Sequence, residues 1–269
     1  HWVAPSIQPT LERLRTDDGL ELTGWLYRPA GASGPGPAVI HLHGGPEAQE
    51  RATFNPLFQE LCSRRVAVFA PNVRGSSGFG HTFVNADNGP ARTAAIADVA
   101  ACVGYLVDAG IAEPGQIGCA GRSYGGYLTL AALTTYPDLF AVGIDVCGMS
   151  DLTTFYANTE PWIAASAVSK YGHPQRDLAL LRELSPLRRV DRITAPLLVV
   201  HGANDSNVPV SESEQLVAAL DRLGHTHRYL CFPDEGHEIL DRANREILNA
   251  AAVDWLCHHL AEARVPAAW

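Results

Sequence analysis

Six short apolar segments recur along the chain, and stretches with helical periodicity separate most of them. These segments are rich in β-branched residues and cover residues 38–42, 66–70, 117–120, 142–146, 197–200 and 228–232. Continuous apolar runs of this length are typical of parallel strands buried on both faces. The stretches between and after them predict helices over residues 56–63, 96–110, 125–136, 212–223 and 242–263. We therefore predict an α/β fold with a doubly wound, mostly parallel sheet and helices on both faces.

Two further segments complete the predicted architecture. Residues 11–15 and 20–27 flank Asp17-Asp18-Gly19, and an Asp-Gly pair between alternating apolar segments is a strong hairpin signal. Residues 151–191 contain no clear strand and are too numerous for an ordinary loop, which predicts an inserted helical excursion. The chain is long enough to bury one sizeable core, so we expect one domain over residues 1–269.

The distribution of charged and apolar residues along the chain argues against two classes of partner, nucleic acids and membranes. The chain carries a net charge of −9 and shows no basic cluster, so we do not expect a nucleic-acid partner. No apolar run approaches the roughly 20 residues that span a bilayer, so we expect no membrane partner either.

The cysteines also limit the chemistry. The chain has six, with no C-x-x-C pair and no closely spaced group of cysteine and histidine that resembles a metal site. We therefore expect neither a metal nor a cofactor and interpret the cysteines as buried free thiols, which suits a reducing cytoplasm. The sequence does not begin with Met, which leaves a removed signal, and hence secretion, open.

One glycine-rich motif carries the strongest chemical signal. Gly121-Arg122-Ser123-Tyr124-Gly125 follows a predicted strand and precedes a predicted helix. In this context a G-x-S-x-G sequence is typical of a nucleophile elbow, whose glycines permit the sharp turn. The N-terminus of the helix favours developing negative charge beside the serine. We predict that Ser123 is the nucleophile of a serine hydrolase.

A serine hydroxyl needs a neighbouring base, and after a nucleophile elbow the expected order is serine, acid, histidine. Asp205 lies in the loop after the predicted strand 197–200, and His237 follows the last predicted strand. This order and placement predict that Asp205 orients His237, which accepts the serine proton. Asp234 and Glu235 lie on the same short loop as His237 and are interpreted as solvated carboxylates.

Amide or ester chemistry also needs donors for the oxyanion of the tetrahedral intermediate. The backbone N–H of Tyr124, directly after the nucleophile, is the first candidate. The second lies in His43-Gly44-Gly45-Pro46, after the predicted strand 38–42, where glycine permits close approach to a substrate oxygen. We favour the N–H of Gly45, with Gly44 as the alternative.

These motifs resemble the prolyl oligopeptidase family of serine peptidases, which has the α/β-hydrolase fold, and especially its acylaminoacyl-peptidase-like and dipeptidyl-peptidase-like branches. The resemblance extends over nearly the whole chain. It rests on residues 43–46, 72–80 and 121–127, on the Asp205 loop and on Asp234-Glu235-Gly236-His237. It implies a serine peptidase or amide hydrolase that forms an acyl-enzyme with short peptides or aminoacyl compounds.

The resemblance also implies a substrate site. An aromatic or apolar P1 pocket is expected, and Phe155, Tyr156 and Trp162 in the helical excursion are candidates to line it. Asn207, two residues after Asp205, resembles the dipeptidyl-peptidase pattern, in which an amide side chain binds a substrate carbonyl. Family members usually carry a β-propeller ahead of the hydrolase domain, and we expect none in this chain. Besides substrate, the expected partner is therefore an upstream β-propeller domain or a second copy of this chain in a homo-oligomer.

Two other functions remain open at this point. A carboxylesterase would use the same serine, histidine and oxyanion donors, because esters and amides share the acyl-enzyme route. A non-catalytic binding domain could retain the fold. Such a domain normally lacks a member of the triad, whereas Ser123, Asp205 and His237 are all present.

Overall fold

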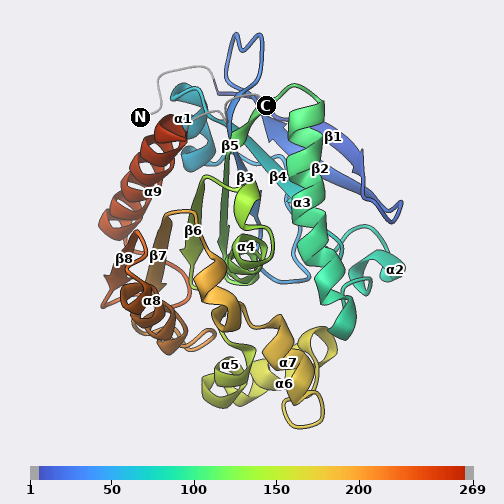
Figure 1. Cartoon of the computed structure of the whole chain (residues 1–269), viewed down its shortest axis with the longest axis vertical. Coiled ribbons are helices and arrows are strands. Elements are labelled where there is room, and N and C mark those ends of the chain that lie inside the picture. The colour runs from blue at the N-terminus through green and yellow to red at the C-terminus, as the bar shows by residue number, and fades with distance from the viewer. Residues whose placement is uncertain (1–5, 264–269) are drawn as a thin grey trace.

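The computed structural model describes residues 6–263, which are built around an eight-stranded sheet (Figure 1). The strands are β1 (Thr10–Arg15), β2 (Glu21–Tyr27), β3 (Gly36–Leu42), β4 (Ala67–Asn72), β5 (Ala112–Arg122), β6 (Val142–Val146), β7 (Leu197–Gly202) and β8 (His227–Phe232). Their order across the sheet is β1-β2-β4-β3-β5-β6-β7-β8. The pairs β1–β2 and β2–β4 are antiparallel, and all the others are parallel. The predicted fold class is confirmed.

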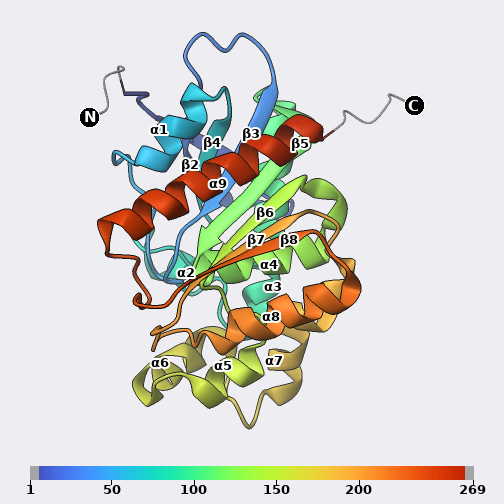
Figure 2. The same ribbon diagram turned by 90° about the vertical axis from the view of Figure 1, so that its left-hand side faces the viewer.

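Helices cover both faces of the sheet (Figures 1 and 2). The α-helices are α1 (Pro56–Ser63), α2 (His81–Val84), α3 (Arg92–Asp108), α4 (Tyr124–Thr135), α5 (Leu152–Asn158), α6 (Pro161–Tyr171), α7 (Leu178–Leu184), α8 (Ser211–Leu223) and α9 (Arg242–Glu262). Short 3₁₀ turns are η1 (Gly89–Ala91), η2 (Pro137–Leu139) and η3 (Pro186–Arg192). One apolar core packs α1 and α9 against the sheet, and a second lies under α3, α4 and α8.

The predicted strand boundaries are wrong at β5. This strand begins at Ala112, five residues before the predicted start, because its first half carries polar and turn-forming residues that conceal the pattern. Gly36 pairs with Ala112, and the register then shifts before Ala38 pairs with Ile117. The longer β5 ends at Arg122 and thus delivers the next residue, Ser123, to the carboxyl edge of the sheet.

The helical excursion is confirmed and consists of α5, α6, α7 and η3. Helices α5, α6 and α7 gather beyond one end of the sheet (Figures 1 and 2), whereas η3 packs against α4 and α8. Asp151 caps α5 by accepting a hydrogen bond from the N–H of Thr153, and Pro161 occupies the first turn of α6. The excursion follows β6 directly and therefore lies beside the carboxyl ends of the parallel strands.

One segment of the described residues, Gly89–Asp108, is long and apolar enough to cross a membrane by length and composition alone. The sequence prediction that no run approaches this length is therefore wrong. The residues that face the sheet, such as Val99, Cys102 and Leu106, are completely buried. Such burial is typical of the core helix of a globular domain.

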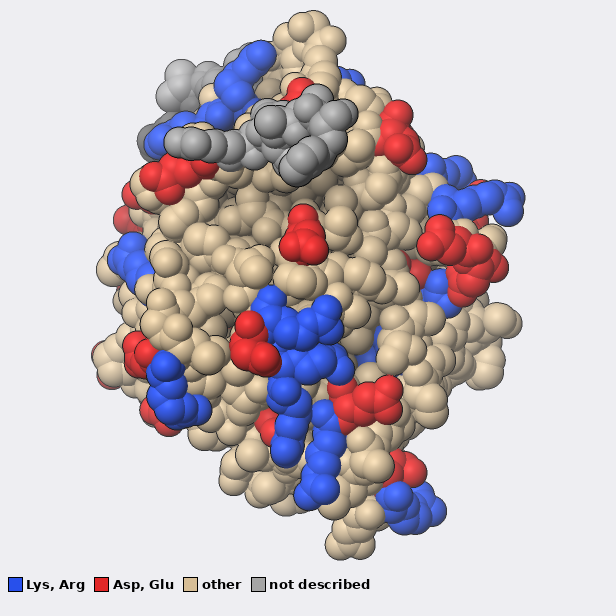
Figure 3. All heavy atoms as spheres, viewed as in Figure 1, with Lys and Arg blue, Asp and Glu red and all other residues tan. Residues whose placement is uncertain are grey.

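The surface in Figure 3 intersperses acidic and basic side chains, with one group of basic side chains near its centre. The turn η3 carries three arginines, each bound to the protein. Arg188 pairs with Asp151, while the other two donate to main-chain carbonyls. All six cysteines are free, and four of them are buried. The prediction of buried thiols is wrong for Cys231, which is exposed on the edge strand β8.

Candidate active site

Ser123 occupies a sharp turn between β5 and α4. Its φ of 57° lies in the left-handed region, and its N–H donates to the carbonyl of Val146 (2.8 Å). A side chain at Gly125 would place Cβ 1.9 Å from the carbonyl oxygen of Leu42. At Gly121, Cβ would lie 2.3 Å from the carbonyl oxygen of Gly125. Both glycines are therefore needed for the turn to fold this tightly.

Three side chains from separate loops meet at this turn. His237 follows β8, and its Nε2 lies 3.1 Å from Ser123 Oγ. On the other side of the ring, His237 Nδ1 lies 2.7 Å from Asp205 Oδ2, in the loop after β7. These are the distances that proton transfer from the hydroxyl to an oriented imidazole requires.

The Asp205 carboxylate is completely buried and fully hydrogen-bonded. Its Oδ1 accepts the N–H groups of Asn207 (2.8 Å) and Val208 (2.9 Å), and its Oδ2 faces His201 and His237. Burial raises its pKa, but the hydrogen bonds from the two histidines outweigh this effect and hold the pKa of Asp205 well below its usual range. The carboxylate therefore stays ionised beside His237.

His201 was missed by sequence reasoning. It lies in β7 with no exposed surface, and its Nε2 is 2.8 Å from the Val208 carbonyl and 3.3 Å from Asp205 Oδ2. Ser213 Oγ lies 2.7 Å from the other ring nitrogen. A histidine that ends a buried apolar strand was the available signal, since a polar group in that position needs partners.

The interpretation of Glu235 as solvated is wrong. Its side chain is buried, and its carboxylate accepts the N–H groups of Leu240 and Asp241 (both 2.9 Å). It therefore stabilises the turn between His237 and α9. Asp234, as expected, is exposed.

The residues of the two candidate oxyanion donors, Tyr124 and Gly45, line the same cavity as Ser123. Tyr124 begins α4, so its N–H has no acceptor one turn earlier in the helix. Gly45 has a φ of 129°, and a Cβ there would lie 2.5 Å from the N–H nitrogen of Ala48. Only glycine fits that conformation, which leaves the backbone of this loop beside the nucleophile.

A cavity of about 970 Å³ opens beside Ser123 and His237. Three of the four predicted substrate residues, Asn207, Phe155 and Trp162, line it. Tyr156 is not among the described residues that line the cavity, so the prediction that it lines the substrate pocket is wrong. Its hydroxyl donates to the carbonyl of Gly172 (2.9 Å), and its ring packs in the core. The apolar part of the cavity wall includes Met149, Phe155, Ile163, Ala167, Tyr171 and Val208.

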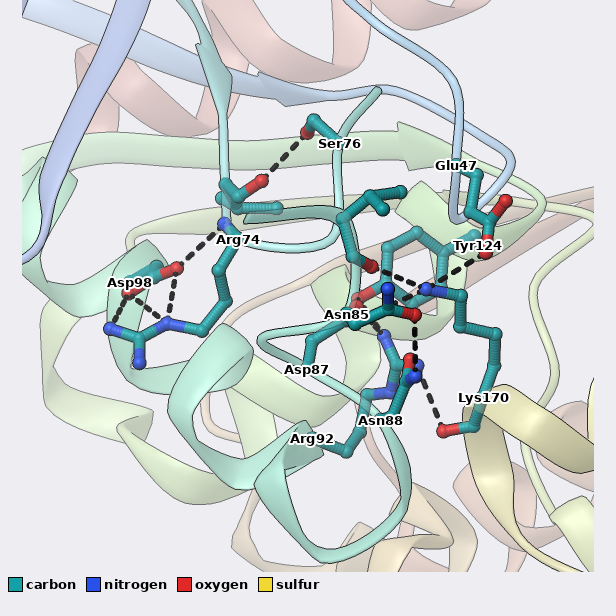
Figure 4. A network of polar contacts seen from close by, with 12 residues as sticks. Glu47, Arg74, Ser76, Asn85, Asp87, Asn88, Arg92, Asp98, Tyr124 and Lys170 are labelled. Carbon is teal, nitrogen blue, oxygen red and sulfur yellow. Dashed lines mark hydrogen bonds and ion pairs between the residues drawn. The ribbon is translucent and has the colours of Figure 1, made fainter. Parts of the chain in front are cut away.

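A buried ionic network supports this wall (Figure 4). Asp87 has no exposed surface and pairs with Arg92 and with Lys170 (3.4 Å). Arg92 also donates to the hydroxyl of Tyr124, the residue after the nucleophile. Lys170 reaches Glu47 (2.9 Å), which follows the Gly45 loop. The network therefore joins α3, α4, α6 and the candidate oxyanion loop around one carboxylate.

Replacing Asp87 by asparagine should lower the free energy of unfolding by about 3–5 kcal/mol, because Arg92 would lose its buried counterion and Lys170 would retain only the exposed Glu47 among the carboxylates described here. Urea denaturation of both proteins measures the change. The control is Glu21→Gln, which breaks an exposed pair with Arg13 and should cost less than about 1 kcal/mol. Equal effects of the two substitutions would contradict the role of the network.

Asp145 is a second carboxylate under the elbow that sequence reasoning missed, although a charged residue within an apolar strand was a signal. It is completely buried in β6, and its Oδ1 accepts the N–H of Gly148 (2.9 Å). Its Oδ2 has no hydrogen-bond partner among the described residues. Burial raises the pKa of Asp145 from near 3.8 to about 7.

The pKa of Asp145 predicts a pH-dependent stability. The native state keeps this proton up to about pH 7, whereas the unfolded chain releases it near pH 4. The contribution of Asp145 is fully present below pH 4 and is lost as the pH rises through about 7. The Asp145→Asn variant cannot ionise, so its unfolding free energy relative to wild type should rise by about 4 kcal/mol between pH 4 and pH 8. Urea titrations at both pH values test this, with exposed Asp138→Asn as the control. A pH-independent difference would contradict it.

The sheet order, the elbow after β5 and the acid and histidine after β7 and β8 together define an α/β-hydrolase. Residues 52–263 match the model of the prolyl oligopeptidase family, and the chain belongs to that family.

Relatives and solved structures agree with this assignment. The chain is 38% identical over 234 residues to dipeptidyl aminopeptidase BIII of Pseudoxanthomonas mexicana, covering 85% of this chain and 34% of that protein. It is 28% identical to an acylamino-acid-releasing enzyme of Arabidopsis thaliana, covering 77% of this chain and 28% of that protein. The chain thus spans about a third of the length of the curated relatives it matches.

The solved structures show the same fold. A puromycin-hydrolysing peptidase of Mycobacterium tuberculosis superimposes with a TM-score of 0.88 at 28% identity, over 94% of this chain and 39% of that one. An acylaminoacyl peptidase of Pyrococcus horikoshii also gives 0.88, at 26% identity, over 99% of this chain and 44% of that one.

Proposed function

We propose that this protein hydrolyses amide bonds of short peptides or aminoacyl compounds through an acyl-enzyme on Ser123. The observation that carries the proposal is the chain of contacts from Ser123 Oγ through His237 to the buried Asp205 carboxylate. His237 would accept the serine proton during attack and then protonate the leaving amine. The N–H groups of Tyr124 and Gly45 would stabilise the oxyanion.

The cavity favours an apolar or aromatic side chain next to the scissile bond. Its wall of aliphatic and aromatic residues can desolvate such a group, and its volume of about 970 Å³ leaves room for a neighbouring residue. Asn207, on the loop that holds Asp205, offers an amide for a substrate carbonyl. Relatives named as dipeptidyl and acylamino-acid peptidases, and the puromycin-hydrolysing neighbour, support aminoacyl or peptidyl substrates.

Phe155→Ala should weaken selection for an aromatic P1 side chain. We expect the ratio of kcat/KM for phenylalanyl over alanyl anilide to fall about tenfold, because an aromatic face of the pocket is removed. The ratio is independent of the fraction of folded enzyme. Tyr156→Phe is the control, since this neighbouring residue is not among the described residues that line the cavity, and an equal fall there would contradict the assignment.

The leaving group of the substrate distinguishes a peptidase from the competing function, a carboxylesterase. Matched aminoacyl anilide and aryl ester substrates should both be hydrolysed by a peptidase, because His237 protonates the poor amine leaving group. Ester hydrolysis with no detectable anilide hydrolysis would overturn the peptidase proposal and support the esterase.

A further inference from the structure

A buried thiol lies under the candidate triad and takes no part in the proposed mechanism. Cys147 follows β6, is 2% exposed and has a φ of 45°. Its N–H donates to the carbonyl of Val200 (2.8 Å), which places it between the carboxyl ends of β6 and β7. The Sγ atom lies 4.0 Å from the carbonyl oxygen of His237.

The Cys147 thiol, the Asp205 carboxylate and the His237 imidazole converge. One potential ligand atom from each residue lies within 4.8 Å of the other two. Thiolate, imidazole and carboxylate are the ligands that zinc takes, with bonds of about 2.0–2.3 Å and tetrahedral ligand separations of roughly 3.3–3.8 Å. Side-chain movements of about 1 Å would therefore close the cluster on an ion.

We propose that Cys147, Asp205 and His237 form an inhibitory site for a thiophilic divalent cation such as Zn²⁺. The ion would enter from the substrate cavity, which His237 lines, and a water molecule would occupy the fourth position. Hard cations such as Mg²⁺ and Ca²⁺ prefer oxygen ligands and should not bind here.

Inhibition follows from the proton arrangement on His237. In the working triad Nδ1 carries hydrogen toward Asp205, and Nε2 is free to accept the proton of Ser123. A cation bound to Nδ1 shifts that hydrogen to Nε2, so the base nitrogen can no longer accept a proton. The Cys147 thiol releases one proton to solvent as its sulfur binds the ion. On His237 the Nδ1–H bond breaks and an Nε2–H bond forms, and the ion exchanges bound water molecules for the three protein ligands.

A second cluster provides a control within the same chain. His258 Nε2 and His259 Nδ1 lie 3.3 and 3.7 Å from Glu262 Oε2 at the end of α9. His258 and Glu262 are both exposed, and the substrate cavity is lined by other residues. Zn²⁺ bound at that cluster should leave hydrolysis unchanged.

The experiment compares wild type, Cys147→Ala and His258→Ala. Aminoacyl anilide hydrolysis is measured against free Zn²⁺ set by a metal buffer. Wild type and His258→Ala should lose activity at the same Zn²⁺ concentration and recover it with EDTA. Cys147→Ala should keep its basal activity and need at least tenfold more Zn²⁺ for the same inhibition. Equal inhibition of wild type and Cys147→Ala would overturn the site.

A second readout tests ion binding without catalysis. Cd²⁺ is titrated into the Cys231→Ser protein, which lacks the exposed thiol, with and without Cys147→Ala. The ultraviolet charge-transfer band of a cadmium–thiolate bond should appear with Cys147 and be lost without it. The inhibitory consequence rests on the proposed function, but this band does not. If no variant hydrolyses any substrate, the proposed function fails while the band still decides the metal site.

Discussion

Replacing Ser123 by alanine is expected to lower kcat for aminoacyl anilides by about 10⁴- to 10⁶-fold, because the atom that attacks the carbonyl is removed. The elbow itself should survive, since its turn depends on Gly121 and Gly125 rather than on the hydroxyl. Steady-state kinetics measure the loss, and circular dichroism checks that the variant is folded.

The matched control is Ser166→Ala. Ser166 lines the same cavity, but its hydroxyl donates to the carbonyl of Ile163 in α6 and meets no base among its described hydrogen-bond partners. Its activity should stay within a few-fold of wild type. A folded Ser123→Ala protein with more than a tenth of wild-type activity would contradict the nucleophile assignment.

Asp205→Asn should lower kcat by about 10⁴-fold while the protein stays folded. The amide oxygen can still accept the N–H groups of Asn207 and Val208 at the Oδ1 position. At the other position an NH₂ group would face His237 Nδ1 and favour the ring tautomer that carries hydrogen on Nε2. That tautomer cannot accept the serine proton.

The control for this prediction is Asp234→Asn. Asp234 is an exposed carboxylate on the loop that carries His237, so its loss changes the local charge without touching the imidazole contacts. Its kcat should stay within about threefold of wild type. Losses of similar size in the two variants would show that local charge, rather than ring orientation, explains the effect.

Much of the fold and the three central residues could be predicted because their signals are local. Buried parallel strands can be recognised in the sequence as continuous apolar runs. Ser123 can be recognised because it lies in a glycine turn between a strand and a helix. Asp205 and His237 follow from chain order, since the carboxyl ends of parallel strands share one edge of the sheet. Chain order was therefore sufficient to predict that His237 lies beside Ser123, although the two residues are 114 positions apart in the sequence.

The supporting groups could not be predicted because their partners are distant in sequence. Asp87 looks like a loop residue until Lys170, 83 positions away, is placed beside it. His201 and Asp145 lie inside strands, where only the folded structure shows which neighbours satisfy them. Cys147 is one of six scattered cysteines, and nothing in its local sequence places it beside His237.

The two aromatic residues of α5 show a different limit of prediction from sequence, namely the direction in which each side chain points. Phe155 and Tyr156 are adjacent, and consecutive positions on a helix point about 100° apart. Both rings pack in the apolar core, but of the two only Phe155 is also among the described residues that line the cavity. Sequence composition identified the segment, but the rotation of the helix decided which residue lines the cavity.

Covalent labelling tests the central assignment most directly. A fluorophosphonate reacts with an activated serine, so the labelled protein is digested and the modified peptide is identified by mass spectrometry. The arrangement of Ser123, His237 and Asp205 predicts a single label on Ser123, strongly reduced in Asp205→Asn and absent in Ser123→Ala. A folded wild-type protein that takes no label, or carries it on another residue, would contradict the account.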